Sequence, residues 1–103
     1  MILVTLGTQD QKFYRLLDAL ENSKIKDKII VQAGGSSDYQ SKKMEIFRFI
    51  DYKDMEKYID DADLIITHGG TGSIIMPLQF SIFTRKGGWV CKTMLKNLDF
   101  HGL

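Results

Sequence analysis

The sequence contains little cysteine, proline or histidine: one Cys, one Pro and two His among 103 residues. A single cysteine, Cys91, can form neither a disulfide framework nor a thiolate metal cluster. Because His68 and His101 are the only histidines, we do not expect a zinc site or any other bound metal. This composition is typical of a chain that works in a reducing compartment.

An excess of one charge and a long hydrophobic run are also missing. The 14 Lys and Arg residues nearly balance the 13 Asp and Glu residues, so the net charge of +1 gives no electrostatic reason to expect a nucleic-acid partner. The apolar start, residues 1–6, has no basic stretch before it and stops at Gly7. We therefore expect neither a signal peptide nor a membrane span.

Two standard nucleotide motifs are absent. No G-x-x-x-x-G-K-[ST] occurs, which argues against a P-loop NTPase. Gly70 and Gly72 match the first two glycines of the dinucleotide fingerprint, but Ile75 stands where glycine or alanine is needed. The motif also follows the fourth predicted strand instead of the first, so a nicotinamide dehydrogenase is not expected. No Ser-His-acid set or carboxylate pair supports a hydrolase.

What the sequence does contain is an alternation of short apolar runs with helical stripes. Strands are predicted at 2–6, 28–33, 45–50 and 63–67. Helical spacing joins Phe13, Leu16, Leu17 and Leu20, and again Met55, Tyr58, Ile59 and Ala62. Asp51 or Asp54 begins the second helix, and a third is predicted from Gly72, with Pro77 interrupting it. The pattern predicts one α/β domain over 1–103, in which a parallel sheet carries helices on both faces.

In such a sheet the loops that leave the carboxyl ends of the strands gather along one edge, where ligands bind. We expect four segments to meet there: 7–11, 34–35, 51–54 and 68–73. The last of them, together with Thr67 before it, reads "THGGTGS". Its glycines can bring backbone N–H groups and a helix N-terminus to one point, which is a site for an anion such as phosphate.

Two side chains of this loop allow two readings each. Ser73 could donate to a phosphate oxygen or simply cap the helix, and the two are about equally supported. His68 could exchange a proton with a substrate. A single histidine at a strand end more often shapes its loop by hydrogen bonding, which is the reading we favour.

Three stretches together resemble the C-terminal half of family 28 glycosyltransferases: "MILVTLGTQDQKFYRLLDAL", "VQAGGSSDY" and "FRFIDYKDMEKYIDDADLIITHGGTGSI". The resemblance covers residues 1–75 and is lost after 76. It is closest to small donor-binding subunits of bipartite UDP-sugar transferases. These include the cytosolic subunit of the dolichol-linked UDP-GlcNAc transferase and its capsule or exopolysaccharide counterparts.

The resemblance implies a Rossmann-like domain that forms one half of a GT-B glycosyltransferase and binds a UDP-sugar as substrate, without a cofactor or metal. Gly7 and Thr8 would contact the phosphates, and the backbone of Ile50 would contact uracil. The loop residues implied to contact the diphosphate and donor sugar are Gly69, Gly70, Gly72 and Ser73, with His68 beside them.

The resemblance also implies a partner. Small subunits of this family are cytoplasmic and are held at the membrane face by a membrane-anchored subunit that binds the lipid-linked acceptor. The cleft lies between the two halves, so neither acts alone. The implied reaction is transfer of a hexose or amino sugar by direct displacement at the anomeric carbon.

The segment after Ile75 departs from the family. Met76 and Pro77 interrupt the helix, and the later family pattern is missing, so we expect an atypical or truncated C-terminus. The tail is either diverged or replaced through a frame change. The chain is then either a donor-binding subunit or a non-catalytic remnant or interaction module. An unrelated flavodoxin-like phosphate-binding domain, which would bind flavin, is a third reading.

Overall fold

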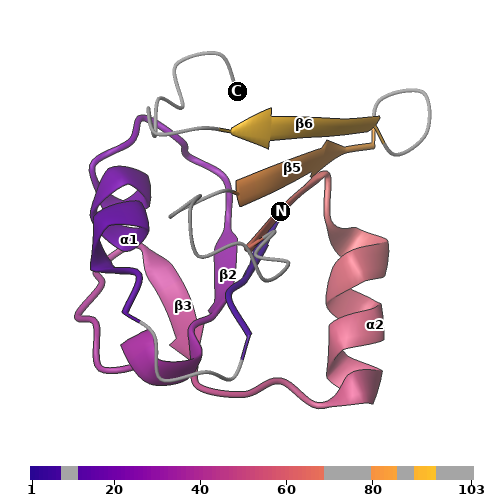
Figure 1. The fold of residues 1–103 in the computed structure, drawn as a ribbon. Coiled ribbons are helices and arrows are strands. Elements are labelled where there is room, and N and C mark those ends of the chain that lie inside the picture. Colours follow the sequence, from indigo (N-terminus) through magenta and orange to yellow (C-terminus); the bar gives the residue numbers. More distant parts are fainter. Residues whose placement is uncertain (8–11, 69–79, 86–89, 95–103) are drawn as a thin grey trace, which may run out of the picture.

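The computed structural model describes residues 1–7, 12–68, 80–85 and 90–94, with the side chains of 80, 81 and 90–94 left aside. Figure 1 shows a sheet flanked by two helices. The strands are β1 (Ile2–Thr5), β2 (Ile29–Gln32), β3 (Met44–Phe47), β4 (Leu64–His68), β5 (Phe80–Thr84) and β6 (Val90–Met94). The helices are α1 (Tyr14–Glu21), α2 (Tyr52–Asp61) and the short 3₁₀ turn η1 (Gly34–Ser36).

The strands form one sheet in the order β3-β2-β1-β4-β5-β6. β1 pairs in parallel with both β2 and β4, and β2 pairs in parallel with β3, which confirms the four predicted strands and their direction. β5 and β6 run antiparallel to their neighbours. This hairpin was not predicted.

The sequence does carry a signal for the hairpin. The runs "FSIFT" and "VCKTM" are rich in β-branched and aromatic residues, and Gly87 and Gly88 stand between them. Two such runs around a glycine pair are typical of a β-hairpin. The third helix, predicted from Gly72, lies outside the described residues except for Phe80, which begins β5.

Alternate residues of each strand pack on opposite faces of the sheet, because successive side chains of a strand point to opposite sides. On the face covered by α1, buried side chains form a large cluster: Ile2, Val4, Leu6, Phe13, Leu16, Leu17, Leu20, Ile29, Val31, Ala33, Met44, Ile66 and Ile82. On the face covered by α2 the buried cluster is smaller: Leu3, Ile30, Ile50 and Ala62. Figure 1 shows the two helices on opposite sides of the sheet, as predicted.

The two helices begin in different ways. Asp51 caps α2: its carboxylate oxygen accepts a hydrogen bond from the backbone N–H of Asp54 at 2.8 Å. Of the two aspartates considered from the sequence, Asp51 is therefore the cap. α1 has no side-chain cap of its own, and the residue before it, Phe13, donates its backbone N–H to Ser36 Oγ at 2.7 Å.

The connection from β2 to β3 contains η1 and a loop in place of a crossover helix, and it is fastened to α1 by polar side chains. The Tyr39 hydroxyl donates to Asp18 at 2.6 Å, and the Tyr14 hydroxyl donates to Asp38 at 2.6 Å. The two tyrosine rings stack with centroids 6.2 Å apart. α1 is thus held from the sheet side by leucines and from the loop side by hydrogen bonds.

Candidate functional site at the carboxyl edge of the sheet

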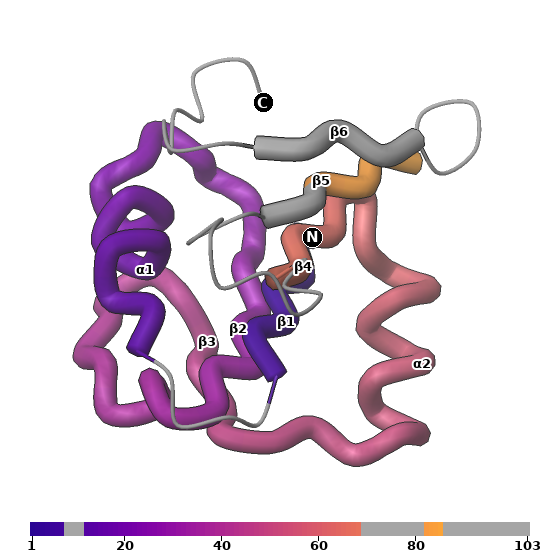
Figure 2. The backbone as a smooth tube through the Cα atoms, in the orientation of Figure 1, coloured from indigo at the N-terminus to yellow at the C-terminus, as the bar shows by residue number. Residues whose placement is uncertain are grey.

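The carboxyl ends of β1 to β4 lie along one edge, because these four strands are parallel. In Figure 2 the backbone leaves β1, β2 and β3 at the bottom of the view, where α2 also starts. Gly7, two residues after β1, has φ +80°, and Gly34, the first residue of η1, has φ +53°. Both values favour glycine. Among the described residues, none would lie within 4 Å of a Cβ added at Gly7, so the constraint there is conformational.

Two loops are joined at this edge. Ser36 is fully buried and accepts the N–H of Phe13, and the Lys12 ammonium donates to the carbonyl oxygen of Gly35 at 2.5 Å. The start of α1 and the turn after β2 therefore form one unit, with the lysine bringing a positive charge to it. Sequence reasoning missed both residues; the serine after the glycine pair in "AGGSS" was the available signal.

His68 is the last residue of β4 and is half-buried. Its ring lies edge-on to the ring of Phe13, with centroids 4.9 Å apart and an interplanar angle of 61°. This contact places His68 beside the first turn of α1, at the edge predicted for it. This ring contact joins the end of β4 to the start of α1, and the role of His68 in the site stays a prediction.

Ile50 lies just before the cap of α2, and its side chain is buried in the α2-face cluster with 7% exposed. Only its backbone groups are left for a ligand. Its neighbours are open to solvent, since Phe49 is 63% exposed and Tyr52 is 78% exposed. The backbone contact of Ile50 with uracil, which the family resemblance implies, stays a prediction.

The remaining predicted site residues lie outside the described part of the chain: Thr8, Gly69, Gly70, Gly72 and Ser73. Within the described residues, no group of three or more His, Cys, Asp or Glu side chains could hold a metal ion. The described helices are also too short or too polar to cross a membrane.

A hollow of about 420 Å³ lies on the α2 face of the sheet, just below the carboxyl edge. Its lining comes from β1, β2, β4, β5 and α2: Leu3, Thr5, Gln32, Met55, Ile59, Ile65, Thr67 and Phe83. Thr5 pairs with both Gln32 and Thr67 in the strand register, so these three polar residues form a row across the ends of three strands.

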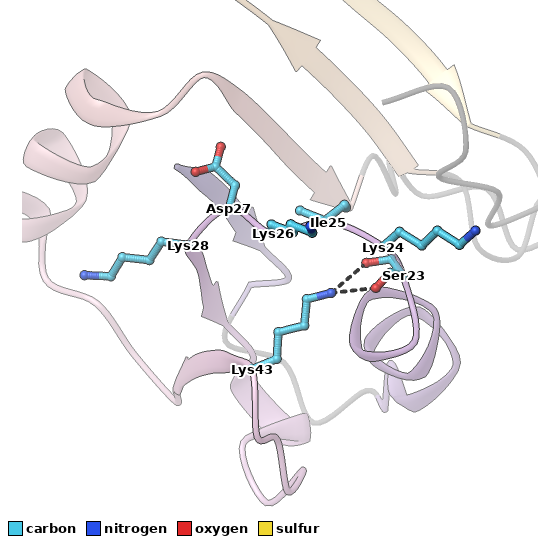
Figure 3. A pocket seen from close by; sticks show the side chains of 7 residues that line it. All are labelled: Ser23, Lys24, Ile25, Lys26, Asp27, Lys28 and Lys43. Carbon is cyan, nitrogen blue, oxygen red and sulfur yellow. Dashed lines mark hydrogen bonds between the residues drawn. The ribbon is translucent and has the colours of Figure 1, made fainter.

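A second hollow, of about 780 Å³, lies at the opposite end of β2, where the segment Ser23–Lys28 leads into that strand. It is lined by four lysines, but Figure 3 shows Lys24 and Lys28 pointing away from each other. Lys43 donates to the Ser23 carbonyl at 2.7 Å. The ammonium groups do not converge on one anion, so this hollow is not a second phosphate site.

Comparison with known proteins agrees with this geometry. The family model described as the glycosyltransferase family 28 C-terminal domain matches residues 1–80, which include β1 to β4 and every loop predicted at the carboxyl edge. Searches of curated proteins and of solved structures gave no match. Because the family model covers well over half of the 103 residues, the chain belongs to the glycosyltransferase family 28 C-terminal domains.

Proposed function

We propose that this chain is the donor-binding subunit of a hexosyltransferase and that it binds a UDP-sugar at the carboxyl edge of its sheet. The observation that carries the proposal is the family match over 1–80, supported by the position of Gly7, Ile50 and His68 at or just after the carboxyl ends of β1, β3 and β4. In open α/β sheets this edge is the ordinary place for a ligand. The glycosyltransferase class follows from family membership, and the particular donor is our proposal.

The chemistry suits a nucleotide diphosphate as leaving group. An acceptor hydroxyl oxygen forms the new bond to the anomeric carbon, the bond from that carbon to the UDP oxygen breaks, and UDP leaves with the electron pair. The hydroxyl proton passes to a base. The negative charge that develops on the diphosphate is stabilised by backbone N–H groups, by the N-terminal end of α1 and by the Lys12 ammonium. Such donors can replace a metal, so we propose that none is required.

The acceptor side of the reaction lies in a partner. We propose a membrane-anchored subunit that holds the lipid-linked acceptor and keeps this chain at the cytoplasmic face of the membrane. Capsule or exopolysaccharide synthesis is the proposed setting, and the support for it is the resemblance of residues 1–75 to subunits of that type. The catalytic cleft would then form only when the two subunits meet.

Titration of UDP into ¹⁵N-labelled protein tests donor binding directly. We expect the amide resonances of Gly7 and Ile50 to shift at millimolar UDP, and to shift equally in the presence of EDTA. Uridine, which lacks the phosphates, should shift Ile50 but not Gly7. An unchanged spectrum at millimolar UDP and UDP-sugar would refute donor binding, and shifts abolished by EDTA would refute metal independence.

A non-catalytic remnant or interaction module is the second candidate, and the end of the chain favours it. The family match stops at residue 80, the hairpin β5–β6 follows, and no residue of α2 is buried. To separate the two candidates, residues 76–103 are replaced by the corresponding tail of a full-length family member. If the chain with the replaced tail binds UDP and the original chain does not, the original chain is a remnant. Binding of UDP by both chains supports the donor subunit.

A further inference from the structure

Ser36 is a fully buried polar residue at the carboxyl edge of the sheet. It ends η1, the turn that follows β2, and its Oγ accepts the backbone N–H of Phe13 at 2.7 Å. Phe13 belongs to a different loop, the one that leads from β1 into α1. Breaking a hydrogen bond that is shielded from water is costly, so this bond fixes the two loops relative to each other.

The position of Ser36 is itself set by the sheet. The backbone N–H of Ala33 donates to the carbonyl oxygen of Phe47, the last residue of β3, at 2.7 Å. The N–H of Gly34 donates to the carbonyl oxygen of Arg48 at 3.2 Å, and the N–H of Ser36 donates to that of Ala33 at 2.9 Å. The turn is thus fastened to the end of β3, and the Ser36 hydroxyl oxygen is an acceptor at a fixed place.

Phe13 connects this fixed acceptor to α1 and to β4. Its carbonyl oxygen accepts the N–H of Leu17 at 3.1 Å, which is the first hydrogen bond of the helix, so the bond to Ser36 sets where α1 begins. Its ring is 3% exposed and lies edge-on to the half-buried ring of His68, with centroids 4.9 Å apart. A chain of contacts therefore runs from the turn after β2, through the start of α1, to the end of β4.

We infer that Ser36 is a positioning residue of the donor site. Its hydroxyl holds Phe13, and through the Phe13 ring it holds His68, in the arrangement that binds the UDP-sugar. The inference rests on the proposed function and deepens it. Ser36 acts through Phe13 and is not assigned a contact with the donor.

The size of the effect depends on how often the binding arrangement is kept. When only a fraction of the molecules has this arrangement, the apparent dissociation constant rises by the inverse of that fraction. Removal of Ser36 Oγ takes away the acceptor of the Phe13 N–H and lets the two loops move apart. We expect the arrangement to persist in about one molecule in ten, which weakens UDP binding about tenfold.

Ser41 offers a matched control, because it joins the same connection between β2 and β3 to the opposite end of α1. Its hydroxyl donates to the carboxylate of Glu21, the last residue of α1, and accepts the backbone N–H of Met44 at 2.8 Å. Loss of this side chain should destabilise the fold without moving the carboxyl edge. Comparison of the two serines therefore separates a loss of positioning from a general loss of stability.

Calorimetric titration of UDP into the full chain tests the inference. Ser36→Ala should weaken UDP binding about tenfold, and Ser41→Ala should leave it unchanged. Phe13→Leu should also weaken binding. The variant with both Ser36→Ala and Phe13→Leu should bind no more weakly than the weaker single variant, because both changes break the same chain of contacts. Circular dichroism confirms that each variant is folded.

NMR signals report on the proposed link itself. The ring of His68 lies next to the ring of Phe13, so the His68 ring-proton resonances depend on where the Phe13 ring lies. These resonances should shift in Ser36→Ala and stay unchanged in Ser41→Ala. A loss of stability alone would not move them in the folded protein.

A measurement on the unmodified protein covers the case in which Ser36→Ala does not fold. UDP binding should slow hydrogen exchange of the Phe13 N–H, which is bonded to Ser36 Oγ. The slowing should be smaller for the Met44 N–H, which is bonded to Ser41 Oγ. Equal slowing at both amides would overturn the inference, because UDP would then stabilise the whole fold and not this link.

Two further outcomes would also overturn it. If UDP binds and folded Ser36→Ala keeps full affinity, or if both serine variants lose affinity equally, Ser36 is a structural residue and only this inference fails. If neither UDP nor UDP-sugars bind to the unmodified chain, the proposed function fails with it.

Discussion

The two helices cover the two faces of the same sheet very unequally. α1 buries Leu16, Leu17 and Leu20, which are 1%, 0% and 0% exposed. α2 is two residues longer, yet it has no buried residue, and Ile59 is 37% exposed. The sheet also differs on its two faces, since the α1 face is lined by aliphatic side chains and the α2 face carries Thr5, Gln32 and Thr67 at the strand ends. The hollow of about 420 Å³ lies on the α2 face, between that helix and the sheet.

The forces that hold the two helices differ accordingly. α1 is stabilised mainly by apolar burial. α2 depends on its ends: Asp51 caps the first turn, and the Arg85 guanidinium, just after β5, donates to the carbonyl oxygens of Asp60 and Ile59 at 2.7 Å each. The unpredicted strand β5 therefore supplies the group that closes the C-terminus of α2.

The largest expected effect is on the α1 face. Leu17→Ala should lower the free energy of unfolding by about 3–5 kcal/mol, because it opens a cavity in the larger cluster. Urea denaturation measures the loss. Leu17→Met, which nearly conserves volume, is the control and should cost less than about 1.5 kcal/mol. A loss below about 1 kcal/mol for Leu17→Ala would contradict the importance of burial under α1.

A smaller effect is expected at the start of α2. Asp51→Ala removes the acceptor for the Asp54 N–H and should cost about 1 kcal/mol. Asp51→Asn keeps a capping oxygen and should cost less. Urea denaturation of both variants compares them, and equal losses would show that the cap hydrogen bond is not what stabilises this end.

On the exposed side of α2, Ile59→Ala should cost only about 1 kcal/mol or less, since the side chain is 37% exposed and little packing is lost. The same denaturation assay applies. A loss comparable to that of Leu17→Ala would break the comparison, because it would mean that the α2 face is as well packed as the α1 face.

The last effect is on the stability of the fold at alkaline pH, and it concerns the hydrogen bonds that join α1 to the connection between β2 and β3. The hydrogen bond to Asp18 raises the pKa of Tyr39 to about 12 from its usual value near 10. A raised pKa in the folded state stabilises the fold at pH below about 10, and this contribution is lost as pH rises from about 10 to about 12.

Melting curves of the unmodified chain and of Tyr39→Phe across that range test the effect. The stability difference between them should shrink as the pH rises. The pKa of Tyr14 is also raised, by its hydrogen bond to Asp38, and acts in the same direction in both proteins. A constant difference up to pH 12 would show that the Tyr39 hydroxyl contributes no pH-dependent stability.

The parallel part of the fold could be predicted because its signals are local. Continuous apolar runs gave β1 to β4, and helical spacing gave both helices, including the buried leucines of α1. The hairpin β5–β6 was not predicted, because each of its runs is only five residues long and Phe80 also continues the third helix predicted from Gly72. Pairing with β4 is a long-range interaction that no local pattern specifies.

At the candidate site, the sequence predicted the positions of the glycine turns but not the contacts between side chains. Gly7 was singled out from the sequence, and its φ of +80° agrees with that choice. The contacts of Ser36 with Phe13 and of Phe13 with His68 join segments that are distant in the chain. Gln32 has the sequence features of an ordinary strand residue, and only the tertiary packing shows that it is 7% exposed and lines a hollow.

The sequence by itself determined the α/β class, the edge at which the glycine turns gather and the family, because periodicity, turn residues and motif order are properties of the chain. The tertiary structure alone decided how completely each face of the sheet is covered. Coverage of a sheet face depends on how closely a helix packs against the strands beneath it. Here α1 packs closely on the larger buried cluster, whereas a hollow lies between α2 and the sheet.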